Sequence, residues 1–330
     1  MKRIGFPISK KENEKRRAML PNHIPFVKNR DYLYFEQGYG EVAGFSDDAY
    51  RQAGAHIVSR EQALAMDIVC DPKIGDAEYL KDLKQGQTIF GWVHAVQNRS
   101  ITDAILSTKL TAIAWEDMYE KGRHVFWRNN ELAGETAIMH AFTLYGKAPY
   151  ECNVAVIGRG NVARGAYKTL SFLGANVTVY DRRTEQLLRD EIGKYDVIVN
   201  GVLWDVYRKD HIIYREDLKR MKRFSIIIDI SCDRAGAIET SVPTTINDPV
   251  YTVDGVLHYV VDHSPTLFHY SVSKTLGNEL VKYLDALIED KAGTNPVLNK
   301  ATIIRDGVIL DQRINDFQNR TPCNPELAKK

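Results

Sequence analysis

The stretch VAVIGRGNVARGAYKTLSFLGANVTVYD, residues 154–181, decides the fold that the sequence predicts. It opens with an apolar run typical of a buried strand and passes through Gly158 and Gly160 into a segment with helical spacing. A second apolar run follows and ends at Asp181. Together with Ala163, the two glycines form a G-x-G-x-x-A pattern where the strand passes into the helix, which predicts a βαβ unit that binds a dinucleotide.

The small residues of this pattern each have a physical task. Gly158 makes the tight turn, Gly160 lets the backbone approach the pyrophosphate, and Ala163 allows the helix to pack on the strand. The phosphates then lie against free N–H groups at the positive end of the helix dipole. We expect the cofactor to contact Gly158, Arg159, Gly160, Asn161, Val162, Asp181, Arg182, Arg183, Gly201, Val202 and His263.

The identity of the cofactor depends on three consecutive residues. Asp181 stands where a carboxylate accepts hydrogen bonds from the ribose of NAD(H). Arg182 and Arg183 follow it and are suited to the extra phosphate of NADP(H), which they would bind through charge-assisted contacts. Because two arginines outweigh one carboxylate for a dianion, NADP(H) is expected and NAD(H) is the less favoured choice. The alternative is that both arginines merely face solvent at a strand end.

The alternation of apolar runs with helix-sized segments continues on the C-terminal side of this unit. The apolar runs YDVIVNGV and FSIIIDIS follow at helix-sized intervals, and residues 251–254 and 257–261 are candidates for further strands. Four β-rich runs joined by helical crossovers predict a doubly wound parallel sheet. Residues 131–280 are therefore expected to form a dinucleotide-binding Rossmann domain.

The N-terminal part of the chain predicts a second α/β domain. Residues 1–130 alternate helical patterns with the apolar runs RIGFPI, AHIVS, MDIVCDP, QTIFGWVHAV and LTAIAWEDM. An amphipathic helix over residues 271–289 would return the chain, so that residues 281–330, with a frayed end, complete this substrate and catalytic domain. The expected architecture is two Rossmann-like α/β domains with a cleft between them.

The composition argues against two classes of binding partner. The 330 residues include 44 basic and 43 acidic side chains, and a formal net charge of +1 offers no field for holding nucleic acid or an anionic membrane. The chain has no apolar N-terminal leader and no apolar run of the ~18 residues that a membrane span needs. We therefore expect a cytoplasmic protein with small-molecule partners, no nucleic acid and no membrane.

The cysteines predict neither a metal site nor a disulfide framework. Cys70, Cys152, Cys232 and Cys323 lie far apart in the sequence, with no Cys-x-x-Cys pair. For Cys232, the role of a small buried hydrophobe is favoured over a catalytic one, because no histidine partner is adjacent in the pattern. No metal is expected.

Three residues of the first domain have the chemistry of a carbonyl- or imine-reducing site. Arg16 lies in a loop after the first strand, where its planar fork is suited to a carboxylate. Lys73 and His94 each follow an apolar run, and side chains at strand ends gather at the crevice of such sheets. Taken singly, a surface lysine and a core histidine are the simpler interpretations, so the residues alone leave both roles open.

The order and spacing of these motifs resemble the alanine dehydrogenase and transhydrogenase family over nearly the whole chain. The opening IGFPISKKENEKRRAMLP is similar to that family's first strand and substrate-arginine loop, with the arginine at Arg16. The resemblance assigns the catalytic lysine and histidine to Lys73 and His94, and an acidic residue near the nicotinamide to Asp233. The runs GRHV (122–125) and VDHSPT (261–266) are more similar to fungal saccharopine dehydrogenases, which make secondary amines.

Among the family's members, the likeness is greatest to short bacterial opine-forming enzymes that use NADPH. This implies reductive condensation of a 2-oxo acid such as pyruvate with the side-chain amine of a diamino acid, ornithine or lysine, in a homo-oligomer. Arg16 would hold the oxo acid, His94 would act as general acid and base, and Lys73 would polarise the carbonyl. Candidates for contact with the diamino acid are Glu116, Arg123 and Asp262. Glu116 has an equally good alternative role as a hydrogen-bonding group between elements.

One motif departs from the family pattern. Alanine dehydrogenases carry Lys-x-Lys-Glu-Pro around the catalytic lysine, whereas this chain reads Asp71-Pro72-Lys73-Ile74-Gly75. The alternative functions are an alanine dehydrogenase that uses ammonium, a saccharopine-type dehydrogenase that uses 2-oxoglutarate, and a nicotinamide-nucleotide sensor without catalysis. The presence of both Lys73 and His94 counts against the sensor.

Overall fold

The chain folds into two compact units of the α/β class. The computed structural model describes residues 1–205 and 207–320, so Cys323 and the expected fraying of the last ten residues lie outside the described part. Unit 1 comprises residues 1–126 and 269–330, and unit 2 comprises residues 127–268. The sequence predicts domain boundaries at residues 130 and 280, whereas the structure has the whole of α7 (His269–Ile288) in unit 1.

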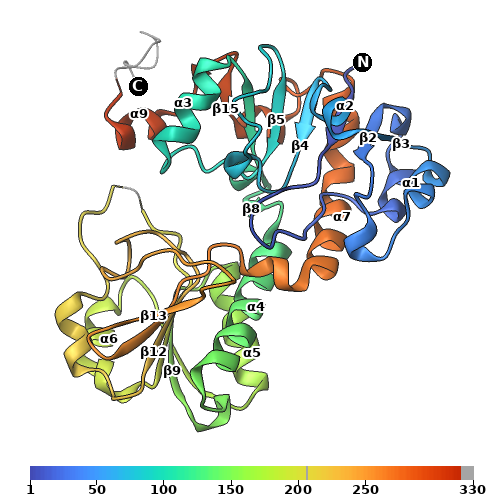
Figure 1. Cartoon of the computed structure of the whole chain (residues 1–330). Coiled ribbons are helices and arrows are strands. Elements are labelled where there is room, and N and C mark those ends of the chain that lie inside the picture. The colour runs from blue at the N-terminus through green and yellow to red at the C-terminus, as the bar shows by residue number, and fades with distance from the viewer. Residues whose placement is uncertain (206, 321–330) are drawn as a thin grey trace. The chain divides into compact units, whose positions relative to one another are not determined.

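Unit 1 is built on an eight-stranded sheet (Figure 1). In spatial order its strands are β16 (Val308–Ile309), β15 (Thr302–Arg305), β6 (Thr111–Ala114), β5 (Thr88–Gly91), β4 (Ile68–Cys70), β1 (Ile4–Phe6), β2 (Leu33–Glu36) and β3 (His56–Val58). Neighbours from β6 to β3 are parallel, and β15 and β16 are antiparallel additions. The C-terminal segment thus completes a sheet that the N-terminal segment begins.

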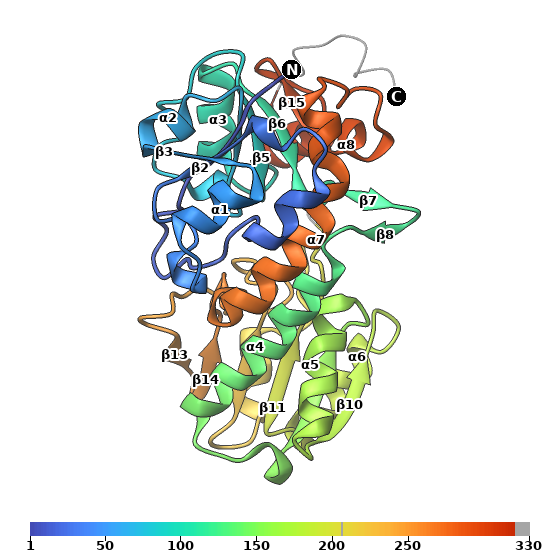
Figure 2. The same cartoon turned by 90° about the vertical axis from the view of Figure 1, so that its right-hand side faces the viewer.

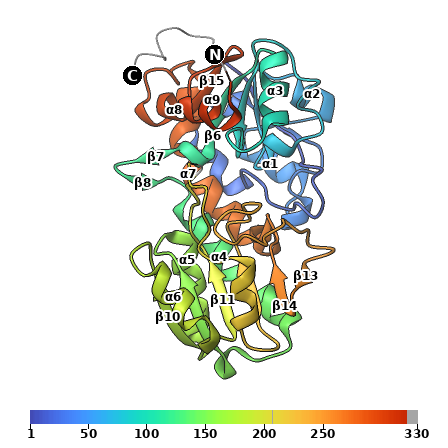
Figure 3. The ribbon, with the colours of Figure 1, turned by 90° about the vertical axis from the view of Figure 1, so that its left-hand side faces the viewer.

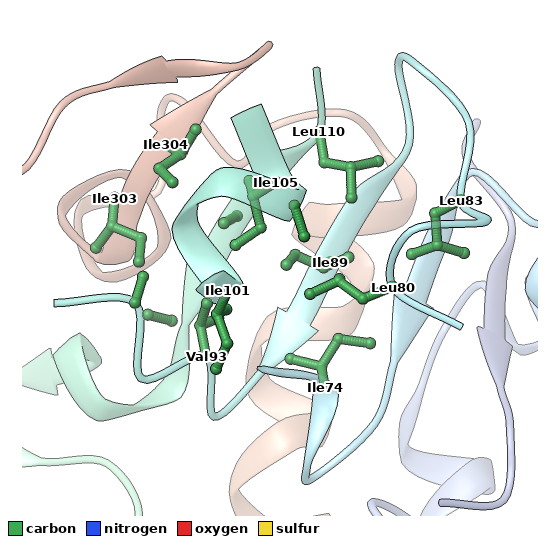
Figure 4. Close-up of a cluster of buried hydrophobic side chains, with 14 of the residues drawn as sticks. Ile74, Leu80, Leu83, Ile89, Val93, Ile101, Ile105, Leu110, Ile303 and Ile304 are labelled. Atoms are coloured by element: carbon green, nitrogen blue, oxygen red, sulfur yellow. The ribbon is translucent and has the colours of Figure 1, made fainter. Parts of the chain in front are cut away.

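Helices cover this sheet and supply its core. Besides α7, the α-helices of this unit are α1 (Asp47–Ala53), α2 (Arg60–Leu64), α3 (Arg99–Ser107), α8 (Pro296–Ala301) and α9 (Gln312–Gln318). The short 3₁₀ helices are η1 (Pro21–Phe26), η2 (Arg30–Tyr32), η3 (Glu41–Ala43), η4 (Ile74–Asp76) and η5 (Trp115–Asp117). Figure 4 shows Ile101 and Ile105 of α3 beside Ile89 of β5 in one buried apolar cluster. The four-residue spacing of the two helical isoleucines puts both on the face that meets the sheet. A small hairpin of β7 (Tyr119–Glu120) and β8 (Arg123–His124) lies outside the large sheet (Figure 2).

Unit 2 has the doubly wound sheet that the sequence predicts. Its strands, in spatial order, are β10 (Asn176–Tyr180), β9 (Asn153–Ile157), β11 (Val197–Asn200), β12 (Ile226–Asp229), β14 (Val256–Tyr259) and β13 (Val250–Val253), all parallel except β13. Because β9 pairs with β10 on one side and β11 on the other, the winding reverses beside β9. In open parallel sheets, ligands bind outside the carboxyl ends of the strands at such a switch point.

Alternating residues of β9 face two separate cores. Val154 and Val156 pack with residues of α4 (Trp127–Tyr145) and α5 (Asn161–Phe172), the helices on one face (Figure 2). Ala155 and Ile157 pack on the other face, where α6 (Glu185–Glu191) lies (Figure 3). Burial on both faces explains why this strand reads as a continuous apolar run.

The remaining 3₁₀ helices of unit 2 are η6 (Pro149–Glu151), η7 (Ile192–Lys194), η8 (Arg215–Arg220) and η9 (Ser264–Phe268).

Two local features add to the sequence predictions. The segment before β12 was expected to be a helical crossover, and the helix there is the 3₁₀ helix η8 over residues 215–220. Strand β2 was not predicted, because only Leu33 and Phe35 of its four residues are buried and the run is short. Within the described ranges, no helix is both long enough and apolar enough to cross a membrane.

Candidate active site

The glycine loop of unit 2 makes a turn that suits a residue without a side chain. Gly158 follows β9 with φ +108°, and its N–H donates to the Tyr180 carbonyl at 2.8 Å. A Cβ placed on Gly158 would lie 3.2 Å from the Gly201 carbonyl oxygen and 3.3 Å from Cγ2 of Val202. The loop after β9 and the loop after β11 therefore touch at the switch point, as the expected cofactor contacts require.

Gly160 opens this loop toward the start of α5. It is the N-cap of that twelve-residue helix, and nothing lies within 4 Å of where its Cβ would be. The N–H groups of the first turn, including those of Asn161 and Val162, have no acceptor within the helix. Open space in front of unsatisfied donors at a helix N-terminus is what a pyrophosphate needs, so the loop fits a dinucleotide.

A pocket of about 260 Å³ lies beside the loop, and charged side chains line much of it. Nε of Arg159 lies 3.0 Å from Oδ2 of Asp181, and Oδ1 of Asp181 accepts the backbone N–H of Arg183 at 3.0 Å. Arg182 lines the pocket, and its side chain and that of Arg183 are exposed. The Asp181 carboxylate is thus already neutralised by a neighbouring guanidinium.

Sequence reasoning missed one wall of this pocket. Glu185, Leu203, Trp204, Asp205 and Arg208 also line it. The Arg208 guanidinium lies 4.4 Å from the centre of the Trp204 ring and donates to both carboxylate oxygens of Glu185 at 2.9 Å. These residues come from α6 and from the loop after β11, and no short motif marks them.

Four further residues from the sequence analysis lie elsewhere in unit 2. Asp233 follows β12; burial, and secondarily the charge of Asp229, raise its pKa to about 7. His263 is buried and its Nδ1 contacts the carboxylate of exposed Asp262. Cys232, expected to be a buried hydrophobe, is only partly buried, and its thiol donates to the Asp229 carbonyl at 3.2 Å.

Unit 1 gathers four predicted residues at one edge of its sheet. Lys73, His94 and Glu116 follow the carboxyl ends of β4, β5 and β6, and Arg16 follows β1 in a longer loop. These four strands are parallel neighbours in the order β6-β5-β4-β1. Carboxyl ends of parallel strands meet at the same edge, so the four loops share it. Arg123, by contrast, lies on the β7–β8 hairpin with an exposed side chain.

The loop that carries Lys73 is held rigidly against β5. The buried Asp71 carboxylate accepts the Lys73 backbone N–H at 2.8 Å and the Tyr79 hydroxyl at 2.7 Å. A Cβ on Gly75 would lie 2.0 Å from the Val93 carbonyl oxygen, so only glycine permits this approach. The sequence Asp71-Pro72-Lys73-Ile74-Gly75 thus packs this loop tightly on the next one.

Lys73 itself is buried and lies beside a carboxylate. Its Nζ is 3.3 Å from Oδ2 of Asp76, the same oxygen that accepts Nζ of Lys11 at 2.9 Å. Burial alone would raise the pKa of Asp76, but the neighbouring positive charges, Lys73 first, hold it below its ordinary value. Neither Asp76 nor Lys11 was predicted as a site residue.

His94 sits on a strained turn that Glu116 stabilises. Its φ is +52°, a left-handed conformation that costs a residue with a side chain about 1–2 kcal/mol. The Glu116 carboxylate accepts the backbone N–H groups of His94 at 2.6 Å and Val93 at 3.1 Å. Burial raises the pKa of Glu116 to about 7. The exposed imidazole is thereby fixed at the sheet edge by a carboxyl group of the next strand.

Arg16 forms a two-pronged ion pair with a carboxylate of its own loop. Nε and Nη2 donate to Glu14 at 2.8 and 2.5 Å, and both side chains are buried. The guanidinium lies 5.2 Å from the centre of the Trp92 ring, within cation–π range. Glu14 was also missed from the sequence, although its spacing of two residues from Arg16 is visible there.

Family models match both parts of the chain. The model described as "Alanine dehydrogenase/PNT, N-terminal domain" matches residues 5–127, and "Alanine dehydrogenase/PNT, C-terminal domain" matches residues 182–313. Among solved structures, an L-alanine dehydrogenase superposes with a TM-score of 0.81 at 22% identity, covering 96% of this chain and 99% of that one. A transhydrogenase from Sinorhizobium meliloti superposes with a TM-score of 0.76 at 20% identity, covering 92% and 99%. These likenesses confirm the predicted fold class.

Curated relatives align along most of their length. An N(5)-(carboxyethyl)ornithine synthase of Clostridium botulinum is 32% identical over 87% of this chain and 98% of the relative. Alanine dehydrogenase 1 of Staphylococcus aureus is 26% identical over 92% of this chain and 93% of the relative. The predicted resemblance, including that to opine-forming members, is confirmed. The chain belongs to the alanine dehydrogenase/PNT family and is a nicotinamide-dependent oxidoreductase.

Proposed function

We propose that this enzyme uses NADPH to condense pyruvate reductively with the side-chain amine of ornithine or lysine, giving an N-(carboxyethyl) amino acid. The observation that carries the proposal is the 32% identity to a carboxyethylornithine synthase over 98% of that relative's length. The sheet edge of unit 1 supports it, because a guanidinium, an ammonium and an imidazole stand in neighbouring loops there.

In this proposal Arg16 and Lys73 hold the oxo acid. The guanidinium binds the carboxylate of pyruvate, and Lys73 polarises the carbonyl that the amine attacks. The rigid Asp71 turn and the close packing at Gly75 support an accurate placement of the lysine. Fixing both reactants converts a rare encounter into a near-unimolecular step.

His94 moves the protons. The amine adds to the carbonyl with a proton passing to its oxygen, and the carbinolamine then loses water when that oxygen is protonated again. The protonated imine that results would accept the hydride that NADPH supplies when bound, which gives the secondary amine. An exposed imidazole on a turn held by Glu116 is suited to give and take these protons, which makes Glu116 a group that positions His94. Asp233 is the proposed acidic residue beside the nicotinamide.

The preference for NADPH rests on the charges around Asp181. Its carboxylate lies 3.0 Å from Nε of Arg159, which leaves it less able to repel a phosphate. Arg182 lines the same pocket and Arg183 is exposed beside it. A phosphate group on the ribose would meet these guanidinium groups in charge-assisted hydrogen bonds. Asp262 and Arg123 remain the proposed contacts of the diamino acid, and the working enzyme is proposed to be a cytoplasmic homo-oligomer.

The test is NADPH oxidation across a small matrix of substrates. Pyruvate, 2-oxoglutarate and other oxo acids are combined with ornithine, lysine, ammonium and no amine, and NADH is run in parallel. We expect turnover only when pyruvate and a diamino acid are both present, with a product heavier than the amino acid by one carboxyethyl group. Activity with no combination would overturn the proposal and leave a nucleotide sensor.

Two enzymatic alternatives give different patterns in the same matrix. An alanine dehydrogenase would oxidise the cofactor as fast with ammonium as with ornithine, and the 26% identity to alanine dehydrogenase 1 of Staphylococcus aureus is the reason to include it. A saccharopine-type enzyme would prefer 2-oxoglutarate to pyruvate. The oxo acid and the amine are therefore varied independently.

A further inference from the structure

The carboxylate of Asp76 has one oxygen engaged and one oxygen available. Oδ2 accepts a hydrogen bond from Nζ of Lys11 at 2.9 Å and lies 3.3 Å from Nζ of Lys73. In the part of the chain that the structure describes, no group donates a hydrogen bond to Oδ1. The side chain is 32% exposed, so the carboxylate is accessible to a small molecule and keeps one oxygen as an acceptor for it.

Asp76 lies beside the loop that carries His94. It ends the 3₁₀ helix η4, and the residue before it, Gly75, donates its N–H to the Trp92 carbonyl at 3.1 Å. Gly75 also packs so closely on the Val93 carbonyl that a Cβ would lie 2.0 Å from its oxygen. Because these two contacted residues directly precede His94, the packing holds Asp76 next to the turn of the group that is proposed to move protons.

Three side chains set the charge around Asp76. Burial alone would raise its pKa, but Lys73 first, then Lys11 and more weakly His94 hold the pKa below its ordinary value. The group is therefore a carboxylate at neutral pH. One carboxylate between two ammonium groups leaves an excess of positive charge, which disfavours a further ammonium beside them. An amine bound here is thus favoured in its neutral form, which is the form that attacks a carbonyl.

We propose that Oδ1 of Asp76 accepts a hydrogen bond from the reacting side-chain amine of the diamino acid. The bound nitrogen then lies beside Lys73, the group proposed to polarise the carbonyl of the oxo acid. One proton of the entering ammonium passes to His94, one remaining N–H donates to Asp76, and the lone pair is left for the carbonyl carbon. The inference rests on the proposed function for the identity of the amine, and it adds a contact in unit 1 to Arg123 and Asp262, the contacts already proposed for this substrate.

The alternative is that Asp76 only anchors Lys73. Both roles predict slower turnover when the carboxylate is removed, but they differ in the substrate that is affected. An anchor for Lys73 predicts weaker pyruvate binding or a lower kcat, with an unchanged KM for ornithine. Contact with the amine predicts a higher KM for ornithine and no effect on a ligand that lacks the amine. Norvaline is such a ligand, because it has the carbon chain of ornithine without the distal nitrogen.

The first experiment compares Asp76→Asn with the parent enzyme in steady-state kinetics with NADPH. We expect the KM for ornithine to rise about tenfold through loss of one charge-assisted hydrogen bond, and the KM for pyruvate to change less than about threefold. Asp76→Glu keeps the charge but displaces the oxygens by one methylene, and should give an intermediate KM even if Asp76→Asn folds poorly. The control Asp82→Asn removes an exposed carboxylate from the same connection between β4 and β5 and should leave both constants unchanged.

The second experiment measures binding without turnover, by calorimetry on the full chain saturated with NADP⁺. The parent enzyme should bind ornithine about tenfold more tightly than norvaline, and Asp76→Asn should bind the two amino acids alike. Equal affinity of the parent for both, or binding of neither, would overturn the inference. An undiminished preference for ornithine in Asp76→Asn would overturn it as well. Weaker pyruvate binding with an unchanged KM for ornithine would show that Asp76 only anchors Lys73.

Failure of this inference and failure of the proposed function give different results. Turnover of pyruvate and ornithine with a KM for ornithine that Asp76→Asn does not change would refute the contact and leave the proposed reaction standing. A preference for ornithine over norvaline that depends on Asp76, without turnover in the parent enzyme, would support the contact and refute the reaction.

Discussion

The two units carry their functional groups in different ways. In unit 2 the proposed cofactor site is built mainly from the backbone of one strand–loop–helix segment, with Gly158 and Gly160 only two residues apart. In unit 1 the proposed catalytic groups are side chains from four loops, and Arg16 and Glu116 stand a hundred residues apart in the chain. Backbone donors need only a local conformation, whereas the side chains of unit 1 need the whole sheet to bring them together.

The units also differ in the kind of charge that their proposed sites present. The glycine loop exposes N–H groups whose partial charges belong to the fold. The sheet edge of unit 1 holds full charges, and each has a carboxylate beside it, Glu14 for Arg16 and Asp76 for Lys73. Substitutions in unit 1 should therefore alter chemistry and substrate affinity, and substitutions in unit 2 should alter cofactor affinity.

The largest expected effect is that of His94→Ala. Removing the group that transfers protons should lower kcat by about 10²–10⁴-fold. Because the glycine loop lies in the other unit, the Kd for NADPH, measured by quenching of tryptophan fluorescence, should stay within about twofold. Exposed His56, on β3 of the same unit, supplies the matched control His56→Ala. Unchanged turnover in His94→Ala would refute the assignment of His94.

This comparison also explains what could be predicted from the sequence. The dinucleotide loop was visible because its requirements are local, and the fold class followed from apolar runs such as that of β9, buried on both faces. Glu14 and Asp76 were not singled out, because pairing a buried cation with a carboxylate is a property of the folded sheet edge. Arg208 was missed for a different reason, because its partner Glu185 lies 23 residues away in the sequence.

The pH dependence of folding should be shared by both units. Each has a carboxyl group with a pKa of about 7, Glu116 in unit 1 and Asp233 in unit 2, and burial is the main cause in both. A raised folded-state pKa means that the folded protein holds its proton more tightly than the unfolded chain. Between the ordinary carboxyl range and pH 7, raising the pH therefore lowers the free energy of unfolding.

The contribution is at most about 4 kcal/mol per group, since the shifts amount to about two to three pK units. Chemical denaturation at pH 5 and pH 8 measures it, and Glu116→Gln or Asp233→Asn should each remove part of the difference. The control Asp48→Asn removes an exposed carboxylate and should leave the pH 5 to pH 8 difference unchanged. A loss of pH dependence in one variant alone would show that the two units differ in this respect as well.

A pair of glycine substitutions should separate folding from binding within unit 2. Gly158→Ala places a side chain at φ +108° with the Gly201 carbonyl 3.2 Å away, and should destabilise the fold by about 1–3 kcal/mol. Gly160→Ala meets no atom within 4 Å at φ −72°, so the thermal unfolding midpoint should hardly change. Its methyl group should nevertheless weaken NADPH binding by obstructing the pyrophosphate. Equal destabilisation by the two alanines would contradict this difference.

The smallest effect expected is also the most selective one. Arg182 lines the cofactor pocket with an exposed side chain, so solvent screens its charge and Arg182→Ala should cost about 1 kcal/mol of NADPH binding, or roughly fivefold in Kd. The Kd for NADH, which lacks the extra phosphate, should rise less than about twofold. Asp181→Asn gives the complementary test, since removing the carboxylate beside Arg159 should weaken NADH more than NADPH. If Arg182→Ala weakened the binding of NADPH and NADH equally, the arginine would contact a portion of the cofactor that both molecules have. The preference for NADPH would then have to come from other residues of the pocket.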